Sequence, residues 1–197
     1  MNSQFRIEGA SSASNVDAAV ALANTIIRTP EFYDRIRVKP EGFDRRWTSP
    51  AATPEAIAQL LRESRVDVRV RLQKARRKVL GWTYLNQPEV VYLNSRRLDR
   101  TRTSIVATLI HEWVHCVDGI SELDFHHGDN SARGKENSAP YWIDTIAAEM
   151  ASKFFADEDL AESIALAHAM SGSDELLEGL QLADNGLLLD LPNSGVA

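Results

Sequence analysis

The stretch LIHEWVHCVDG, residues 109–119, belongs to a long apolar segment that runs from about Thr103 to Asp118. A helix with one side in water would carry charges at several of the flanking positions. Here those positions are uncharged: Thr108, Leu109, Ile110, Trp113, Val114, Cys116 and Val117. The segment therefore predicts a buried helix that ends at a Gly119 cap.

The same stretch contains the pattern His-Glu-x-x-His, formed by His111, Glu112 and His115. Histidines four residues apart lie on one face of a helix and can bind a single Zn²⁺ ion. Zinc lowers the pKa of water to about 7, and the glutamate beside the first histidine then acts as general base. A chance match is the alternative, but a buried helix would hold the ligands rigidly. The sequence predicts a zinc site with Glu112 as a catalytic residue.

The run from Thr108 to Val117 resembles the extended motif of the zincin metallopeptidases, and the order of elements over residues 53–156 resembles the zincin core. The resemblance implies a hydrolase that cleaves peptide bonds in a peptide or protein substrate. That substrate would lie along an edge strand, for which Val90–Leu93 is the candidate. The expected fold class is α+β and zincin-like: a small antiparallel sheet packs on the HExxH helix, and further helices follow towards the C-terminus.

A catalytic zinc takes three protein ligands and keeps one open position, so a third ligand must follow the helix. Asp118 lies about 10 Å further along the helix axis than His111, too far to share one ion, and is expected to interact locally at the helix end. His127 is the first choice, because a histidine before a glycine, here Gly128, resembles the SprT-like zinc proteases. The match is partial, since Ser131-Ala132 stand where those proteases have an aromatic residue.

Two other residues remain candidates for the third position. Glu149 lies on a later predicted helix, as the zinc-binding glutamate does in gluzincins, although an ion pair with Lys153 would also explain it. His126 is the remaining choice, with an exposed loop position as its alternative. The subfamily, SprT-like or gluzincin-like, therefore stays open.

Two further residues near the motif have candidate roles. Tyr141 begins the next predicted helix and could donate a hydrogen bond to a developing oxyanion, as a tyrosine or histidine does in several zincins. Its alternative is an amphipathic core position. Cys116, the single cysteine, excludes an intrachain disulfide and is expected to be a buried, inert thiol.

Periodicity and turn residues predict the remaining elements. Thr53-Pro54-Glu55 is a helix start, with threonine as N-cap and proline at the first helical position. We expect helices over 15–28, 53–65, 140–156, 157–170 and 174–182, an irregular segment over 31–52, a loop over 120–139, and three strands in an antiparallel meander over 66–72, 79–85 and 89–93. The predicted domain organisation is a flexible tail over 1–13, a single metallopeptidase domain over 14–184, and a second tail over 185–197.

Charge is divided between the two parts of the chain, since residues 1–110 carry 19 Lys and Arg against 11 Asp and Glu, and residues 111–197 carry 3 against 17. The simpler interpretation is attraction within one domain; the other is a basic face for an anionic partner. The basic segment 62–78 thus allows an alternative function, a protease recruited to nucleic acid. Nucleic acid is not favoured, because Arg69 and Arg71 alternate with apolar residues like the solvent side of a strand.

The sequence gives limited information about location. The N-terminus has no apolar core of a signal peptide, and no apolar run approaches the roughly 20 residues of a membrane span. We therefore expect a cytoplasmic protein with no membrane partner. Signal-independent export, as for an effector or toxin protease, stays an alternative. The substrate and the oligomeric state do not follow from these patterns.

Overall fold

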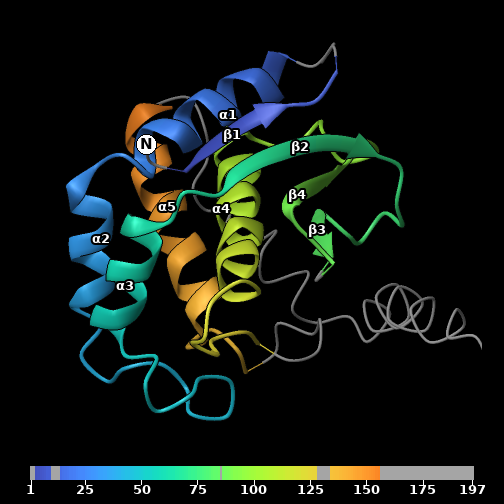
Figure 1. The fold of residues 1–197 in the computed structure, drawn as a ribbon. Coiled ribbons are helices and arrows are strands. Elements are labelled where there is room, and N and C mark those ends of the chain that lie inside the picture. The colour runs from blue at the N-terminus through green and yellow to red at the C-terminus, as the bar shows by residue number, and fades with distance from the viewer. Residues whose placement is uncertain (1–2, 10–13, 85, 128–133, 156–197) are drawn as a thin grey trace, which may run out of the picture.

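The structure, a computed structural model, describes residues 3–9, 14–84, 86–127 and 134–155. Within these ranges it is an α+β domain (Figure 1). Its elements are β1 (Gln4–Ile7), α1 (Ser14–Ile26), α2 (Pro30–Arg37), α3 (Pro54–Glu63), β2 (Asp67–Gln73), β3 (Gly81–Tyr84), β4 (Gln87–Asn94), α4 (Arg102–Asp118) and α5 (Ala139–Phe154). The helices expected over 157–170 and 174–182, and the domain boundary at 184, lie outside the described residues.

The four strands form one mixed sheet in the order β1-β2-β4-β3. β2 is parallel to both β1 and β4, and only β3 runs antiparallel, against β4. The expected antiparallel meander is therefore wrong for β2, whereas the antiparallel pairing of its second and third strands, β3 and β4, is confirmed. A tight hairpin after β2 would favour Gly or Asn, and residues 74–80 contain neither, so β3 lies on the far side of β4 instead. Val90–Leu93, expected at an edge, lies in the interior of the sheet.

The expectation of a flexible tail over residues 1–13 is wrong for Gln4–Ile7, which form the edge strand β1. Phe5 is 2% exposed, and its ring meets the Trp113 ring edge-on at 6.4 Å. The Asn24 side chain accepts the Phe5 N–H at 2.8 Å and donates to the Phe5 carbonyl at 3.0 Å. One buried aromatic residue and one asparagine thus fix a strand that is too short to show a clear period.

The segment 31–52 is irregular only in part, because α2 begins at Pro30. Proline ends one helix and equally suits the first position of the next, and here it does both. Phe32, Tyr33 and Ile36 form the buried face of α2. The predicted start of α3 is confirmed, since the Thr53 hydroxyl accepts the Ala56 N–H at 3.1 Å.

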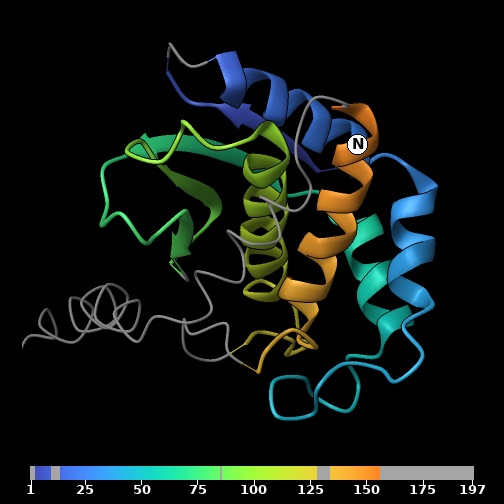
Figure 2. The ribbon, with the colours of Figure 1, turned by 180° about the vertical axis from the view of Figure 1, so that it is seen from behind.

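Helix α4 is buried, as its apolar sequence predicts, and lies at the centre of the domain. It is packed between the sheet, α1 and α5, and α5 runs beside it in the opposite direction (Figures 1 and 2). The Thr101 hydroxyl accepts the Ser104 N–H at 3.2 Å, and the Gly119 N–H donates to the His115 carbonyl at 2.9 Å. These two caps define the ends of the helix, and His111 and His115 lie between them.

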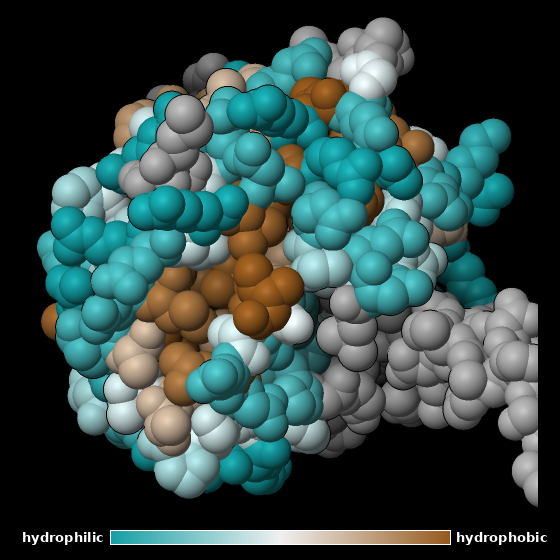
Figure 3. All heavy atoms as spheres, viewed as in Figure 1, coloured by the Kyte–Doolittle hydropathy of each residue, from teal (hydrophilic) through white to brown (hydrophobic). Residues whose placement is uncertain are grey.

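Most large apolar side chains of the described residues lie in the core around α4. On the face seen in Figure 3, apolar surface gathers in the middle of the molecule, and polar residues surround it. Among the described helices, none is both long enough and apolar enough to cross a membrane.

Candidate metal centre

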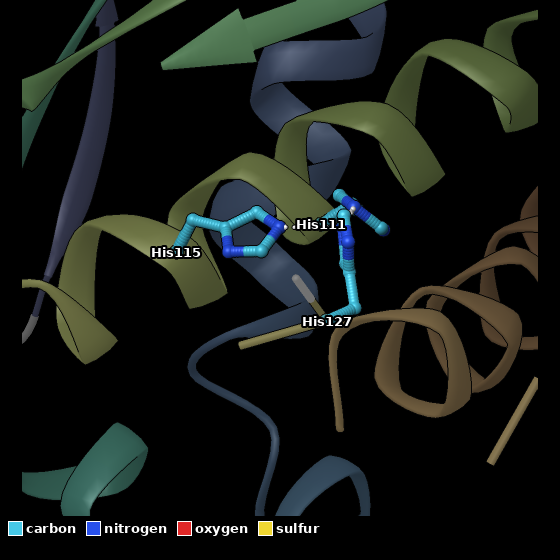
Figure 4. Close-up of side chains that lie close together, drawn as sticks. All are labelled: His111, His115 and His127. Carbon is cyan, nitrogen blue, oxygen red and sulfur yellow. Dashed lines mark hydrogen bonds between the residues drawn. The ribbon is translucent and has the colours of Figure 1, made fainter. Parts of the chain in front are cut away.

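Three histidines from two elements converge beside α4. His111 and His115 lie one turn apart on the helix, and His127 comes from the loop that follows it (Figure 4). The Nε2 atom of His127 lies 3.1 Å from that of His111 and 2.9 Å from that of His115. The structure therefore brings together all three residues predicted as metal ligands.

The arrangement fits a cation better than a set of hydrogen bonds. A neutral imidazole has one N–H, so the Nε2 of His127 cannot donate to both neighbours, although it approaches both. One ligand atom from each histidine lies within 4.8 Å of the other two. Imidazole nitrogens that face a common point at this spacing match a site for a metal ion with bonds of about 2.0–2.1 Å. The three histidines are thus close enough to hold a metal ion.

The orientation of His111 is set by Asp144 on α5. Its Nδ1 lies 2.7 Å from the Asp144 Oδ2, which leaves Nε2 directed at the other histidines. Burial by itself lowers the pKa of His111, but the hydrogen bond and the charge of Asp144 outweigh it, and the pKa is raised. A carboxylate behind a histidine fixes the ring and increases its basicity as a ligand.

His115 has the opposite electrostatic character. Burial holds its pKa well below the ordinary value, and the nearby His127 and His111 lower it further. The ring is therefore neutral at physiological pH. A neutral imidazole offers the nitrogen lone pair that metal binding requires.

Glu112 lies between these histidines in sequence and is 9% exposed. Burial raises its pKa to about 7, although His111 and a hydrogen bond from the backbone of Thr83 favour the carboxylate. Gly81 lies beside Glu112, and a Cβ at this position would be 3.5 Å from the Glu112 Cγ, an ordinary contact, but 2.5 Å from the Thr108 Cγ2, which is too close. A carboxyl group with a pKa near neutrality suits a general base.

Tyr141, at the start of α5, lies against the histidines. Its ring centroid is 4.7 Å from that of His111 and 4.9 Å from that of His127. Its position at the site agrees with the expectation, while its role as a hydrogen-bond donor stays a prediction. Cys116 is buried, as expected, and burial raises the pKa of its thiol to about 12.

The structure places the alternative third ligands elsewhere. Glu149 forms an ion pair with Arg35 of α2, and not with Lys153, whose amine lies 3.8 Å from Glu31. His126 pairs with Asp124 and is exposed. Of the three candidates for the third position, only His127 reaches the histidines of α4.

Asp118 lies at the end of α4, where the sequence predicted a local interaction, and the structure shows one. Its Oδ1 accepts the Phe125 N–H at 2.8 Å, which ties the loop carrying His127 back to α4. Asp118, Asp124 and His126 also offer ligand atoms within 4.8 Å of one another, but two of the three are exposed and no further contact marks them as a binding site.

Asp144, Gly81 and Thr83 contribute to the site and were not identified from the sequence. Asp144 follows Tyr141 by three residues and so shares its face of the helix, which is a usable signal. A glycine inside a strand often marks a close backbone approach, and Gly81 carried that signal. The contact of Thr83 with Glu112 has no counterpart in the sequence pattern.

Comparison of the chain with profiles of known protein families, with curated proteins and with solved structures found no match in any of the three.

Proposed function

We propose that the protein is a zinc-dependent metalloendopeptidase with a zincin-like fold. The proposal rests on one observation: the Nε2 atoms of His111, His115 and His127 converge next to a buried glutamate on the same helix. A site of three protein ligands with one open position is typical of catalytic zinc. Imidazole donors suit zinc but also copper, nickel and iron, so the identity of the metal needs its own measurement.

Each residue of the site has its own role in the proposed hydrolysis. When bound, Zn²⁺ would supply a Lewis acid that lowers the pKa of water and polarises a carbonyl oxygen. Glu112 takes the proton of the attacking water and passes it to the leaving amine as the C–N bond breaks. Tyr141 donates to the oxyanion that develops on the substrate carbonyl. Asp144 holds His111 in the tautomer that presents Nε2 to the metal.

The edge of the sheet beside the site suits an extended peptide. In the described part of the chain, β3 pairs with β4 on one side only, and its Thr83 backbone contacts Glu112. A peptide added to the other side of β3 would lie along the general base. We therefore assign the substrate strand to β3 instead of Val90–Leu93.

The first test is the amount of zinc bound per chain in the wild type and in three variants. We expect about one zinc in the wild type and in Glu149→Ala, and little in His127→Ala. Glu112→Gln should keep the metal and lose hydrolysis of an unfolded protein substrate, because only the base is removed. Zinc lost only from Glu149→Ala would overturn the assignment of ligands. A wild type that binds no zinc when it is supplied would overturn the proposed function itself.

A further inference from the structure

The side chain of Arg100 is buried, and only part of its guanidinium group is hydrogen-bonded. Arg100 precedes the Thr101 N-cap of α4 and is 6% exposed. Its Nη1 donates to the Ser104 carbonyl at 3.2 Å, to the Ser104 hydroxyl at 3.1 Å and to the Thr108 hydroxyl at 2.6 Å. Its Nε and Nη2 are buried and have no hydrogen-bond partner among the described residues. Two of the three guanidinium nitrogens therefore lack an acceptor.

The positive charge of Arg100 is not balanced within the described part of the chain, where no carboxylate forms an ion pair with it. Residues 95–101, which connect β4 to α4, contain three arginines and one acid, the exposed Asp99. Burial and the charge of Arg97 lower the pKa of Arg100 to about 9, and the charge of Asp99 opposes them without restoring it. Arg100 is still a cation at pH 7, and a buried cation without a counter-ion costs free energy.

The two donors that lack an acceptor lie on the same edge of the guanidinium group. The group is planar, and the N–H of Nε runs parallel to one N–H of Nη2. Such an edge matches two oxygens of one carboxylate or phosphate and binds them through two parallel hydrogen bonds. A water molecule would accept a hydrogen bond but would leave the charge unbalanced. An oxyanion supplies both the acceptors and the negative charge.

We propose that the Nε–Nη2 edge of Arg100 binds a small oxyanion with two adjacent oxygens, such as phosphate or a free carboxylate. Arg100 lies on a connection between two elements, and such segments open at lower cost than core helices and strands, so a local movement of residues 95–101 would admit the ion. The bound ion would neutralise the guanidinium group and hold this connection against the side of α4. Binding requires neither a metal at the three histidines nor any hydrolysis.

Titration calorimetry of the full chain with inorganic phosphate, at an ionic strength held constant with sodium chloride, tests the site. We expect saturable binding of one phosphate by the wild type. The same titration with acetate distinguishes the two sources of oxyanion: tighter binding of acetate assigns the site to a carboxylate, and tighter binding of phosphate assigns it to phosphate. Saturable binding of neither ion would overturn the site and leave water as the partner of the two donors.

Three variants locate the ion. Arg100→Met removes the charge at nearly constant length and should abolish binding; loss of an unbalanced buried charge is tolerated in folding. Arg100→Lys keeps the charge but has no pair of parallel donors, so binding should weaken at least tenfold. Arg96→Gln removes an exposed charge from the same connection and should bind within twofold of the wild type. Binding that persists in Arg100→Met would place the ion elsewhere, for example at a metal, because the three histidines are unchanged.

Thermal unfolding gives a second readout. Phosphate at ten times its measured dissociation constant should raise the Tm of the wild type and of Arg96→Gln by about 3–6 °C relative to sodium chloride of equal ionic strength. Arg100→Met should lack this rise. Phosphate also stabilises folded proteins in general by its exclusion from their surface. An equal rise in all three proteins would show that general effect alone and would overturn the site.

Discussion

Asp144 stands behind His111, and its carboxylate is the feature that decides which nitrogen of that ring faces the site. Replacing Asp144 by Asn keeps the size of the side chain and removes its charge. We expect the variant to bind zinc about 10–100-fold more weakly, as is usual when such a partner is lost. Competition with a chelator measures the affinity without any assay of activity.

Asp124→Asn is the matched control for Asp144→Asn, since Asp124 is exposed and pairs with His126 away from the three histidines. Its zinc affinity should equal that of the wild type. Equal losses in the two variants would mean that Asp144 acts through general charge and does not orient His111.

Asp118 gives the free energy of unfolding a predictable dependence on pH. Burial raises its pKa to about 6 from an ordinary 3.8, against the hydrogen bond of Phe125 and the charge of His126 and reinforced by Asp124. Between these values the folded chain binds more protons than the unfolded chain, so this stabilisation is complete below the lower value and is lost as pH rises through about 6.

Asp118→Asn should remove that dependence, because asparagine can still accept the Phe125 N–H and never ionises. The free energy of unfolding of the variant, relative to that of the wild type, should therefore be higher at pH 7.5 than at pH 4.5. Urea unfolding at these two pH values, in the presence of a chelator, measures it. The exposed Glu122→Gln serves as control and should follow the wild type at both pH values. If the free energies of unfolding of Asp118→Asn and the wild type differ by the same amount at both pH values, the role assigned to this carboxyl group is refuted.

The sequence predicted the three histidines that lie together better than it predicted the residues that surround them. The spacing of His111 and His115 places both side chains on one face of the helix, and His127 lies in the loop that follows directly. Asp144 and Glu149 both lie on the same predicted helix, 33 and 38 residues after His111. Only the antiparallel packing of α5 on α4 brings Asp144 to His111 and turns Glu149 to Arg35, and sequence periodicity does not contain that packing.

At the scale of elements, Gly81 controls how closely β3 lies on α4. A Cβ at this position would lie 2.5 Å from the Thr108 Cγ2 and 3.0 Å from the Tyr92 carbonyl oxygen. We expect Gly81→Ala to lower the free energy of unfolding by about 1–3 kcal/mol, as overpacking of a core does. Urea unfolding measures this loss.

Thr108→Ser tests the cause of that loss, because it removes the obstructing methyl group and keeps the hydroxyl that accepts from Arg100. The double variant Gly81→Ala/Thr108→Ser should recover part of the lost stability, the contact with the Tyr92 carbonyl being unchanged. If the double variant is no more stable than the sum of the two single changes predicts, the clash with Thr108 is not the cause.

Local sequence patterns predicted several helices and strands but did not predict which strands pair with one another. The period of two identified β2, and the apolar run identified α4, because each is long enough to show its period. Which strands pair depends on contacts between distant residues, such as the hydrogen bonds from the Asn94 side chain at the end of β4 to the backbone of Ala75, Arg76 and Val79. β1 has four residues and one buried side chain, so its membership in the sheet is visible only in three dimensions.

At the scale of the whole molecule, a metal bound by His127 would join a loop to the central helix and so stabilise the fold. Free zinc at 100 times its dissociation constant adds about 2.7 kcal/mol to the free energy of unfolding. For a chain of this length that corresponds to a rise in Tm of about 5–10 °C. Calorimetry with and without zinc should show the rise in the wild type and in Glu149→Ala and lose it in His127→Ala. A similar rise in all three proteins would place the stabilising metal elsewhere.

The pairing of β1 with β2 sets an order of events on the ribosome. Gln4 can pair only after Asp67, its partner in the register, has been synthesised, about sixty residues later. At about 5–20 residues per second the first strand spends several seconds in the nascent chain without a sheet to join. In that interval the contacts of β1 with α1 are already available, because Asn24, which hydrogen-bonds the backbone of Phe5, is made well before β2.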